Sequence, residues 1–200
     1  MTGTVLQGRS AFVTGSTQGV GLEIAAALSA AGAGVVLHGL RSDAAALLAA
    51  ERCGTVDRPA PLICCDLADP MPDGPLQAAE AAVHQNPQID LLVCNAGTFM
   101  DQPFLDMPLE IFDRTMKLNV YSQFVLIQYF ARRWVAAGVR GRILVTGSIN
   151  GRLSEPTHVA YDASKGAIDA MVRSLCVSLA PLGIRINGMA PGLFRTPLTE

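Results

Sequence analysis

Tyr161 and Lys165 stand four residues apart in a segment with helical periodicity. On a helix the two side chains would share one face, about one turn apart. A free tyrosine has a pKa of about 10 and is a poor base at neutral pH. A lysine ammonium held close to the ring favours the phenolate. The pair could therefore exchange a proton with a carbonyl or alcohol oxygen, and Ser148 could hydrogen-bond and orient the same oxygen.

A second candidate site is the glycine-rich run TGSTQGVG at residues 14–21. It follows a predicted strand and opens a predicted helix. Its glycines allow a tight turn and a close approach to a pyrophosphate, which would meet the partial positive charge of the helix N-terminus. The spacing G-x-x-x-G-x-G differs from the G-x-G-x-x-G fingerprint, and a tight turn without a ligand is the alternative. The position of the run favours a dinucleotide.

Short apolar strands alternate with longer Ala-rich helices along the chain. Strands are predicted at residues 10–14, 35–38, 61–65, 90–94, 142–146 and 185–189. Helices are predicted at 19–31, 44–52 with Asp43 as N-cap, 74–84, in two stretches of 108–137, and at 159–179. This order favours a doubly wound parallel α/β sheet, the Rossmann fold, in three α/β/α layers. We expect residues 1–200 to form a single dinucleotide-binding and catalytic domain.

Composition excludes several other classes of protein. The 200 residues are 50% hydrophobic and 16% charged, too apolar for a disordered chain. The net charge of −2 offers no basic field to nucleic acid or to an anionic membrane. The longest apolar stretch, residues 24–37, is short and broken by Ser29 and glycines, so we expect no membrane span. With no secretory signal at the N-terminus, a cytoplasmic location is predicted.

The five cysteines are an odd number and show neither a C-x-x-C pair nor the Cys/His spacing of a zinc site. Buried free thiols in a reducing compartment are the prediction, rather than a disulfide framework. The three histidines form no hydrolase triad motif, and we expect no metal. His158 could line a substrate mouth or be a structural histidine.

Several motifs, in order, resemble those of the short-chain dehydrogenase/reductase family. They are T-G-x-x-x-G-x-G at residues 14–21, Cys94-Asn95-Ala96-Gly97 (N-N-A-G in the family), Leu118-Asn119-Val120, Ser148, the Y-x-x-x-K of Tyr161 and Lys165, Pro191-Gly192, and Thr196. Cys94 departs from the family pattern, in which Asn stands at that position. The resemblance covers almost the whole chain, and an ordered set is far more specific than any single motif.

The resemblance implies four catalytic residues. Tyr161 is the general acid or base, Ser148 orients the substrate oxygen, Lys165 also binds the nicotinamide ribose, and Asn119 holds a water in a proton relay. Contacts to an NAD(P) cofactor are expected from Gly15, Thr17, Gln18, Gly19, Val20, Gly21, Arg41, Asp66, Leu67, Asn95, Ala96, Gly97, Tyr161, Lys165, Pro191, Gly192 and Thr196.

The choice between NAD and NADP depends on the residues that follow the second strand. The sequence there is His38-Gly39-Leu40-Arg41, with no acid for the ribose 2′-OH of NAD. Arg41 could bind the 2′-phosphate of NADP, but Gln18 stands where the family often carries a basic residue for the same purpose. Both cofactors stay open, and NADP is favoured slightly.

The leading hypothesis is an oxidoreductase that interconverts a ketone and a secondary alcohol, with 3-oxoacyl thioesters and polyols or sugar acids as substrate classes. Arg152 could face a substrate carboxylate or phosphate, or be a solvated loop residue. The rival is a catalytically silent module that binds dinucleotide as a sensor or as an assembly partner. Surplus apolar residues on the helices near 108–137 and 159–180 predict a homodimer or homotetramer.

The family pattern also predicts a further lid helix and a seventh strand after residue 200. If the protein lacks them, the sixth strand would be an unprotected edge and the pocket would be open on one side.

Overall fold

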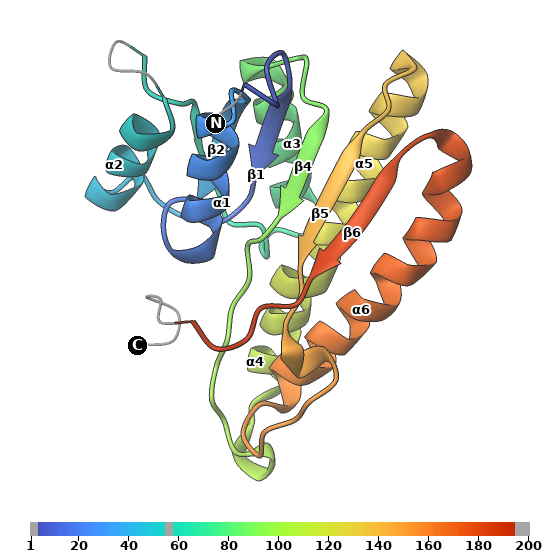
Figure 1. The fold of residues 1–200 in the computed structure, drawn as a ribbon. Helices are drawn as coiled ribbons and strands as arrows, with labels where there is room; N and C mark the ends of the chain where they lie inside the picture. Colours follow the sequence, from blue (N-terminus) through green and yellow to red (C-terminus); the bar gives the residue numbers. More distant parts are fainter. Residues whose placement is uncertain (1–3, 55–57, 195–200) are drawn as a thin grey trace.

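Six parallel strands form one sheet in the computed structural model, which describes residues 4–54 and 58–194 (Figure 1). The strand order is β3-β2-β1-β4-β5-β6, and all neighbouring strands are parallel. The chain builds the sheet outward from β1 to β3, then returns and builds from β4 to β6. This is the doubly wound order, so the predicted fold class is confirmed.

The strands are short and largely buried, as helices on both faces require. Their bounds are β1 Ser10–Val13, β2 Gly34–Gly39, β3 Leu62–Cys64, β4 Leu91–Cys94, β5 Arg142–Thr146 and β6 Arg185–Met189. The α-helices are α1 Gly19–Ala30, α2 Ala44–Cys53, α3 Asp73–Gln85, α4 Leu109–Met116, α5 Ser122–Ala137 and α6 Val159–Leu179. The predicted N-cap is confirmed, because the Asp43 carboxylate accepts a hydrogen bond from Ala46 N at 2.9 Å.

Each face of the sheet has its own buried core. Val13 and Ala49 belong to the core beneath α1 and α2. Phe12 and Phe130 belong to the core beneath α3, α5 and α6, and their ring centroids lie 6.0 Å apart. Neighbouring residues of β1 thus point into opposite cores, as the pleat of a strand requires.

The helical run from α4 to α5 is continuous and contains a π-helical turn, Lys117–Tyr121. Two separate helical stretches were the expectation for this region. A π turn adds one residue per turn, and such turns are frequent at functional sites. Asn119 lies within it and is fully buried. Hydrophobic periodicity did not reveal this turn, because the apolar pattern runs on through it.

The prediction that all the cysteines are buried is wrong for Cys64 and Cys176, although all five thiols are free. Cys64 ends β3, which lies at an edge of the sheet, and Cys176 lies on the exposed side of α6. Their side chains therefore reach solvent from elements that are otherwise packed.

Thr14, directly after β1, joins the carboxyl ends of the two central strands. Its hydroxyl accepts hydrogen bonds from Asn95 N at 2.9 Å and Ala96 N at 3.1 Å and donates to Val93 O at 3.3 Å. Thr14 is 1% exposed, so water cannot replace these contacts.

We predict that Thr14→Val lowers the free energy of unfolding by about 2–5 kcal/mol, because it leaves two buried N–H groups without their acceptor. Thr14→Ser keeps the hydroxyl and is the matched control, with an expected loss below about 1.5 kcal/mol. Urea unfolding followed by circular dichroism measures both. Equal stability of the Val and Ser variants would contradict the prediction.

Candidate active site

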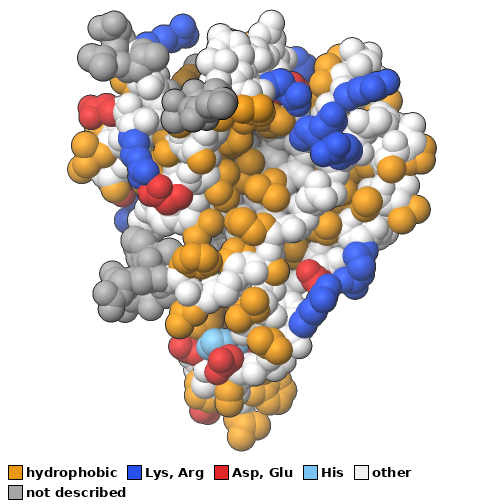
Figure 2. Space-filling model, viewed as in Figure 1, with side chains coloured by type: hydrophobic (Ala, Val, Ile, Leu, Met, Phe, Trp, Pro, Cys, Tyr) orange, Lys and Arg blue, Asp and Glu red, His pale blue; other side chains and the backbone are white. Residues whose placement is uncertain are grey.

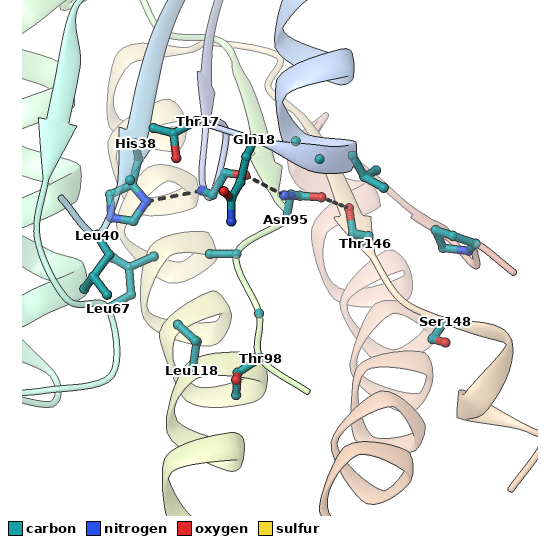
Figure 3. Close-up of a pocket in the computed structure, with 18 of the residues that line it drawn as sticks. Thr17, Gln18, His38, Leu40, Leu67, Asn95, Thr98, Leu118, Thr146 and Ser148 are labelled. Atoms are coloured by element: carbon teal, nitrogen blue, oxygen red, sulfur yellow. Dashed lines mark hydrogen bonds between the residues drawn. The ribbon is translucent and has the colours of Figure 1, made fainter. Parts of the chain in front are cut away.

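A cleft of about 660 Å³ opens at the carboxyl ends of the strands (Figure 3). The loops that follow all six strands line it, together with residues of α4, the π turn and α6. Ligands of open parallel α/β sheets bind at this edge. This one cleft is lined by both candidate sites from the sequence, the glycine-rich turn and the Tyr161–Lys165 pair.

Gly15 and Gly21 are required in the first turn because no side chain fits at either position. A Cβ on Gly15, whose φ is +60°, would lie 2.8 Å from Ala96 Cα, and one on Gly21 would lie 2.1 Å from Gly15 O. Gln18, the N-cap of α1, makes no side-chain cap bond, and the first turn of α1 holds no acidic residue. The backbone N–H groups in the first turn of α1 therefore have no capping side chain as acceptor and suit a bound phosphate.

Asn95 ties three loops together at the centre of the cleft. Its Nδ2 donates to Thr14 O at 3.2 Å and to Gly15 O at 3.0 Å, and its Oδ1 accepts from the Thr146 hydroxyl at 3.2 Å (Figure 3). The loops after β1, β4 and β5 are thus fixed relative to one another. Asn95 shapes the floor of the cleft and lines it.

One end of the cleft combines apolar side chains with a held carboxylate. Leu40 and Leu67 lie at this end (Figure 3). The Asp66 carboxylate accepts from Ala68 N at 2.8 Å and from the Arg114 guanidinium at 2.9 Å. Such a site can pack the faces of a heteroaromatic base and accept its amino hydrogens.

Ser148, Tyr161 and Lys165 line the other end of the cleft. The Ser148 hydroxyl oxygen accepts from Asn150 N at 3.1 Å, which leaves its own proton available to a ligand. Lys165 is 5% exposed, and its Nζ donates to Thr146 O at 3.0 Å. The same Nζ lies 5.4 Å from the centroid of the Tyr161 ring, so the pairing predicted from helical spacing is confirmed.

Burial lowers the pKa of Lys165 to about 8. Desolvation disfavours the ammonium, whose Nζ donates to the neutral Thr146 carbonyl. With this pKa most Lys165 side chains stay protonated at neutral pH. A cation is therefore held next to the Tyr161 ring.

The Tyr161 ring also packs against Phe99. The two centroids lie 5.2 Å apart in an edge-to-face arrangement, and Phe99 packs in the same way on His158 at 4.7 Å. His158 Nε2 lies 3.1 Å from a carboxylate oxygen of Asp101. His158 thus supports the wall beside Tyr161, which agrees with the structural alternative.

Asn119 lies behind the cleft. Its Oδ1 accepts from Thr98 N at 2.7 Å, and its Nδ2 donates to Thr98 O and to the Ser164 hydroxyl, both at 2.9 Å. These contacts join the π turn to the loop after β4 and to α6. The side-chain amide therefore has protein partners at both of its polar atoms.

Most of the predicted cofactor residues line the cleft. These are Gly15, Thr17, Gln18, Gly19, Val20, Gly21, Arg41, Asp66, Leu67, Asn95, Ala96, Gly97, Tyr161, Lys165, Pro191 and Gly192. Thr196 lies outside the described residues. Arg152 forms an ion pair with Asp169 at 3.1 Å, so its guanidinium is held by α6.

Sequence reasoning missed the roles of Thr14, His38, Phe99 and Arg114. Each of them contacts a residue that is distant in the sequence, so no local spacing marked them. Only the position of His38 and Thr14 at strand ends gave a signal, since those ends meet at one edge of a parallel sheet.

The described residues contain no group of three or more His, Cys, Asp or Glu side chains placed to hold a metal ion. Over the same part of the chain, every helix is too short or too polar to cross a bilayer.

Comparisons with known proteins agree with this geometry. A sequence model of the short chain dehydrogenase family matches residues 9–200. The chain is 34% identical over 196 residues to L-xylulose reductase of Bos taurus, spanning 98% of this chain and 75% of that protein.

Two solved structures are similar over almost the whole chain. A short-chain type dehydrogenase/reductase from Mycobacterium marinum has a TM-score of 0.91 at 35% identity, covering 98% of this chain and 77% of that one. A 3-oxoacyl (acyl-carrier-protein) reductase from Agrobacterium tumefaciens C58, with NADP bound, has a TM-score of 0.88 at 29% identity, covering 97% and 73%.

We predict that Lys165 makes stability depend on pH above neutrality. Its folded pKa of about 8 lies below the value of 10.5 for an unperturbed lysine, so the unfolded chain binds more protons between these values. Relative to Lys165→Met, the wild type should therefore gain stability as the pH rises from 8 to 10.5, by up to about 3 kcal/mol. Urea unfolding of both proteins across this range measures the difference, and a constant difference would contradict the prediction.

Proposed function

The chain belongs to the short-chain dehydrogenase/reductase family and acts on CH–OH groups, and we propose that it interconverts a ketone and a secondary alcohol by hydride transfer with NAD(P). One observation carries the proposal. A glycine turn with uncapped helix N–H groups and a Ser148–Tyr161–Lys165 set share a single cleft. The first feature suits a pyrophosphate, and the second suits proton exchange with an oxygen.

Tyr161 is proposed as the general acid and base. In the reducing direction its hydroxyl gives a proton to the carbonyl oxygen while the carbonyl carbon gains the hydride, and the reverse applies to an alcohol. The bound dinucleotide supplies or accepts that hydride. The Lys165 ammonium, 5.4 Å from the ring centroid, stabilises the phenolate that remains after the proton has left. Proton transfer of this kind contributes roughly 10²–10⁴-fold to the rate.

Ser148 and Asn119 have supporting roles in this proposal. The Ser148 hydroxyl donates to the substrate oxygen and fixes its position against Tyr161, which favours a reactive geometry. Asn119 holds the π turn against Thr98 and Ser164 through its three hydrogen bonds. A relay water held by Asn119, as the family implies, would have to bind beside an amide that already has these partners.

For the cofactor we propose NADP in preference to NAD. Arg41 is exposed and lines the cleft after β2, where it can reach a 2′-phosphate. The residue before Arg41 is Leu40, not the acid that would bind the ribose 2′-OH of NAD. The similar reductase from Agrobacterium tumefaciens was solved with NADP bound.

Two substrate classes are proposed, 3-oxoacyl thioesters and polyols or sugar acids. The names of the similar proteins include both a 3-oxoacyl reductase and L-xylulose reductase. Ile149 and Leu153, which follow Ser148, are exposed. On the face of the molecule drawn in Figure 2, hydrophobic side chains gather along the middle and at the lower tip. Together with the pairing of Arg152 to Asp169, this favours a substrate with an apolar chain.

A single domain and a cytoplasmic location also stay predictions. Fractionation of the source cells would test the location.

We predict turnover when the protein is mixed with NADPH and a panel of ketones, or with NADP and the matching alcohols, with NADH and NAD run in parallel.

Tyr161→Phe should lower kcat by at least about 100-fold, because the proton donor is lost. Its Kd for NADPH, measured by fluorescence, should stay within about twofold of the wild-type value, since the ring remains in place. Tyr121→Phe, at an exposed tyrosine of the π turn, is the matched control.

Cofactor binding without turnover on any member of the panel would favour the silent-module alternative. Normal kcat in Tyr161→Phe would remove Tyr161 from its role.

We also propose a homodimer or homotetramer built on α5 and α6. An apolar groove of about 500 Å³ runs between these helices. Phe124 and Val135 on α5, and Leu182 just after α6, line the groove and are about half exposed. Exposed apolar side chains gathered in one groove are typical of an interaction surface.

We predict a dimeric or tetrameric mass in light scattering and a smaller mass for Val135→Asp, because a carboxylate in the interface would lose its water. Leu47→Asp, at an exposed leucine of α2, is the control and should assemble like the wild type. A monomeric wild type, or an unchanged mass for Val135→Asp, would contradict the proposed interface.

A further inference from the structure

His38 lies at the end of β2, directly beside the glycine turn, and is 4% exposed. Its Nδ1 lies 3.2 Å from Gly15 N, and its Nε2 lies 3.2 Å from Cys65 O (Figure 3 draws the first contact). A backbone N–H can only donate and a carbonyl can only accept. The two contacts therefore assign the neutral imidazole with its hydrogen on Nε2.

The surroundings of the ring agree with this neutral form. Burial lowers the pKa of His38 to about 4, against weaker opposing effects from Cys65 O and the Asp66 carboxylate. The Cys65 thiol, 3.6 Å from Nε2, has its own pKa raised to about 11 by burial and is uncharged as well. At neutral pH the Nδ1 lone pair thus stays available to Gly15.

His38 holds the turn at three points. Besides the Gly15 contact, its carbonyl accepts from Ser16 N at 2.8 Å, and its N–H donates to the Ser16 hydroxyl at 3.0 Å. Gly15 has φ +60° and packs against Ala96, so its backbone has little freedom to move away from the cleft floor. Of these three contacts, only the one made by the ring nitrogen requires a particular residue at position 38, since the other two use the backbone of that residue.

We propose that His38 is a positioning residue of the dinucleotide site, whose Nδ1 fixes Gly15 so that the turn and the first N–H groups of α1 are ready for a pyrophosphate. The proposal rests on the proposed function, because it assumes that the cleft binds a dinucleotide. The alternative is a ring that only fills space, packed edge-to-face on Phe12 with centroids 6.3 Å apart. The two roles differ in what they require, since filling space requires the ring and positioning requires the acceptor at Nδ1.

Two substitutions separate the roles. His38→Phe keeps an aromatic ring beside Phe12 but removes the acceptor, leaving the Gly15 N–H without a partner. His38→Asn loses the ring but can place its side-chain oxygen near the position of Nδ1. His84→Phe, at an exposed histidine of α3, is the matched control.

The experiment measures the Kd of NADPH by fluorescence and of ADP by calorimetry, well below the unfolding temperature of each variant. His38→Phe should raise both Kd values by about tenfold, because the free turn moves to hydrate the Gly15 N–H and binding must bury that group again without an acceptor. His38→Asn should bind both ligands more tightly than His38→Phe, even if its unfolding temperature is lower. A ring that only fills space predicts the opposite order.

Kd values of His38→Phe within twofold of the wild type would overturn the proposal while the proposed function stands. Failure of the wild type to bind NADPH, NADH or ADP would instead overturn the proposed function, and this inference with it. If His38→Phe does not fold, His38→Gln replaces it, because its amide reaches the position of Nε2 and not that of Nδ1. Equal Kd values for the Asn and Gln variants would then overturn the proposal.

Discussion

The cleft depends on hydrogen bonds that join the ends of β1 and β4. Thr14 and Asn95 sit side by side where the chain leaves these strands, and each satisfies backbone groups of the other loop. In a doubly wound sheet the chain runs in opposite directions from this point, so the loops separate and leave a crevice. Without the bonds between Thr14 and Asn95, that crevice would have no fixed floor. Gly15 and Gly21 are then needed because the turn lies so close to this floor that a Cβ would collide with it.

At the other end of the cleft the controlling feature is a buried charge. Lys165 is nearly inaccessible, and its ammonium donates to the Thr146 carbonyl. A buried cation without a carboxylate costs stability, which the lowered pKa of Lys165 reflects. Lys165 lies on α6 one turn after Tyr161, and its Nζ is 5.4 Å from the centroid of that ring. In the proposed mechanism this cation stabilises the Tyr161 phenolate.

Much of this arrangement could be predicted from the sequence, for identifiable reasons. Strands and helices followed from periodicity, and the Tyr161–Lys165 pairing followed from a spacing of four residues on a helix. The contacts of Phe99 with Tyr161 and of Arg114 with Asp66 could not be predicted, because they join loops and helices 48 or more residues apart. The π turn around Asn119 was hidden for another reason, since one extra residue in a turn leaves the apolar pattern almost unchanged.

The polar groups of the cleft divide into two kinds, and the division explains how it can be both rigid and reactive. Asn95, Asn119 and His38 direct their side chains at protein atoms and are largely or wholly satisfied there. Within residues 4–54 and 58–194, no protein acceptor meets the first N–H groups of α1, the Ser148 proton or the remaining Lys165 hydrogens. The satisfied groups come from the ends of β2 and β4 and from the π turn, and they fix the loops. The unsatisfied groups lie on the surface that those loops present. A ligand that binds there meets donors already in place, so little ordering of the protein opposes its binding.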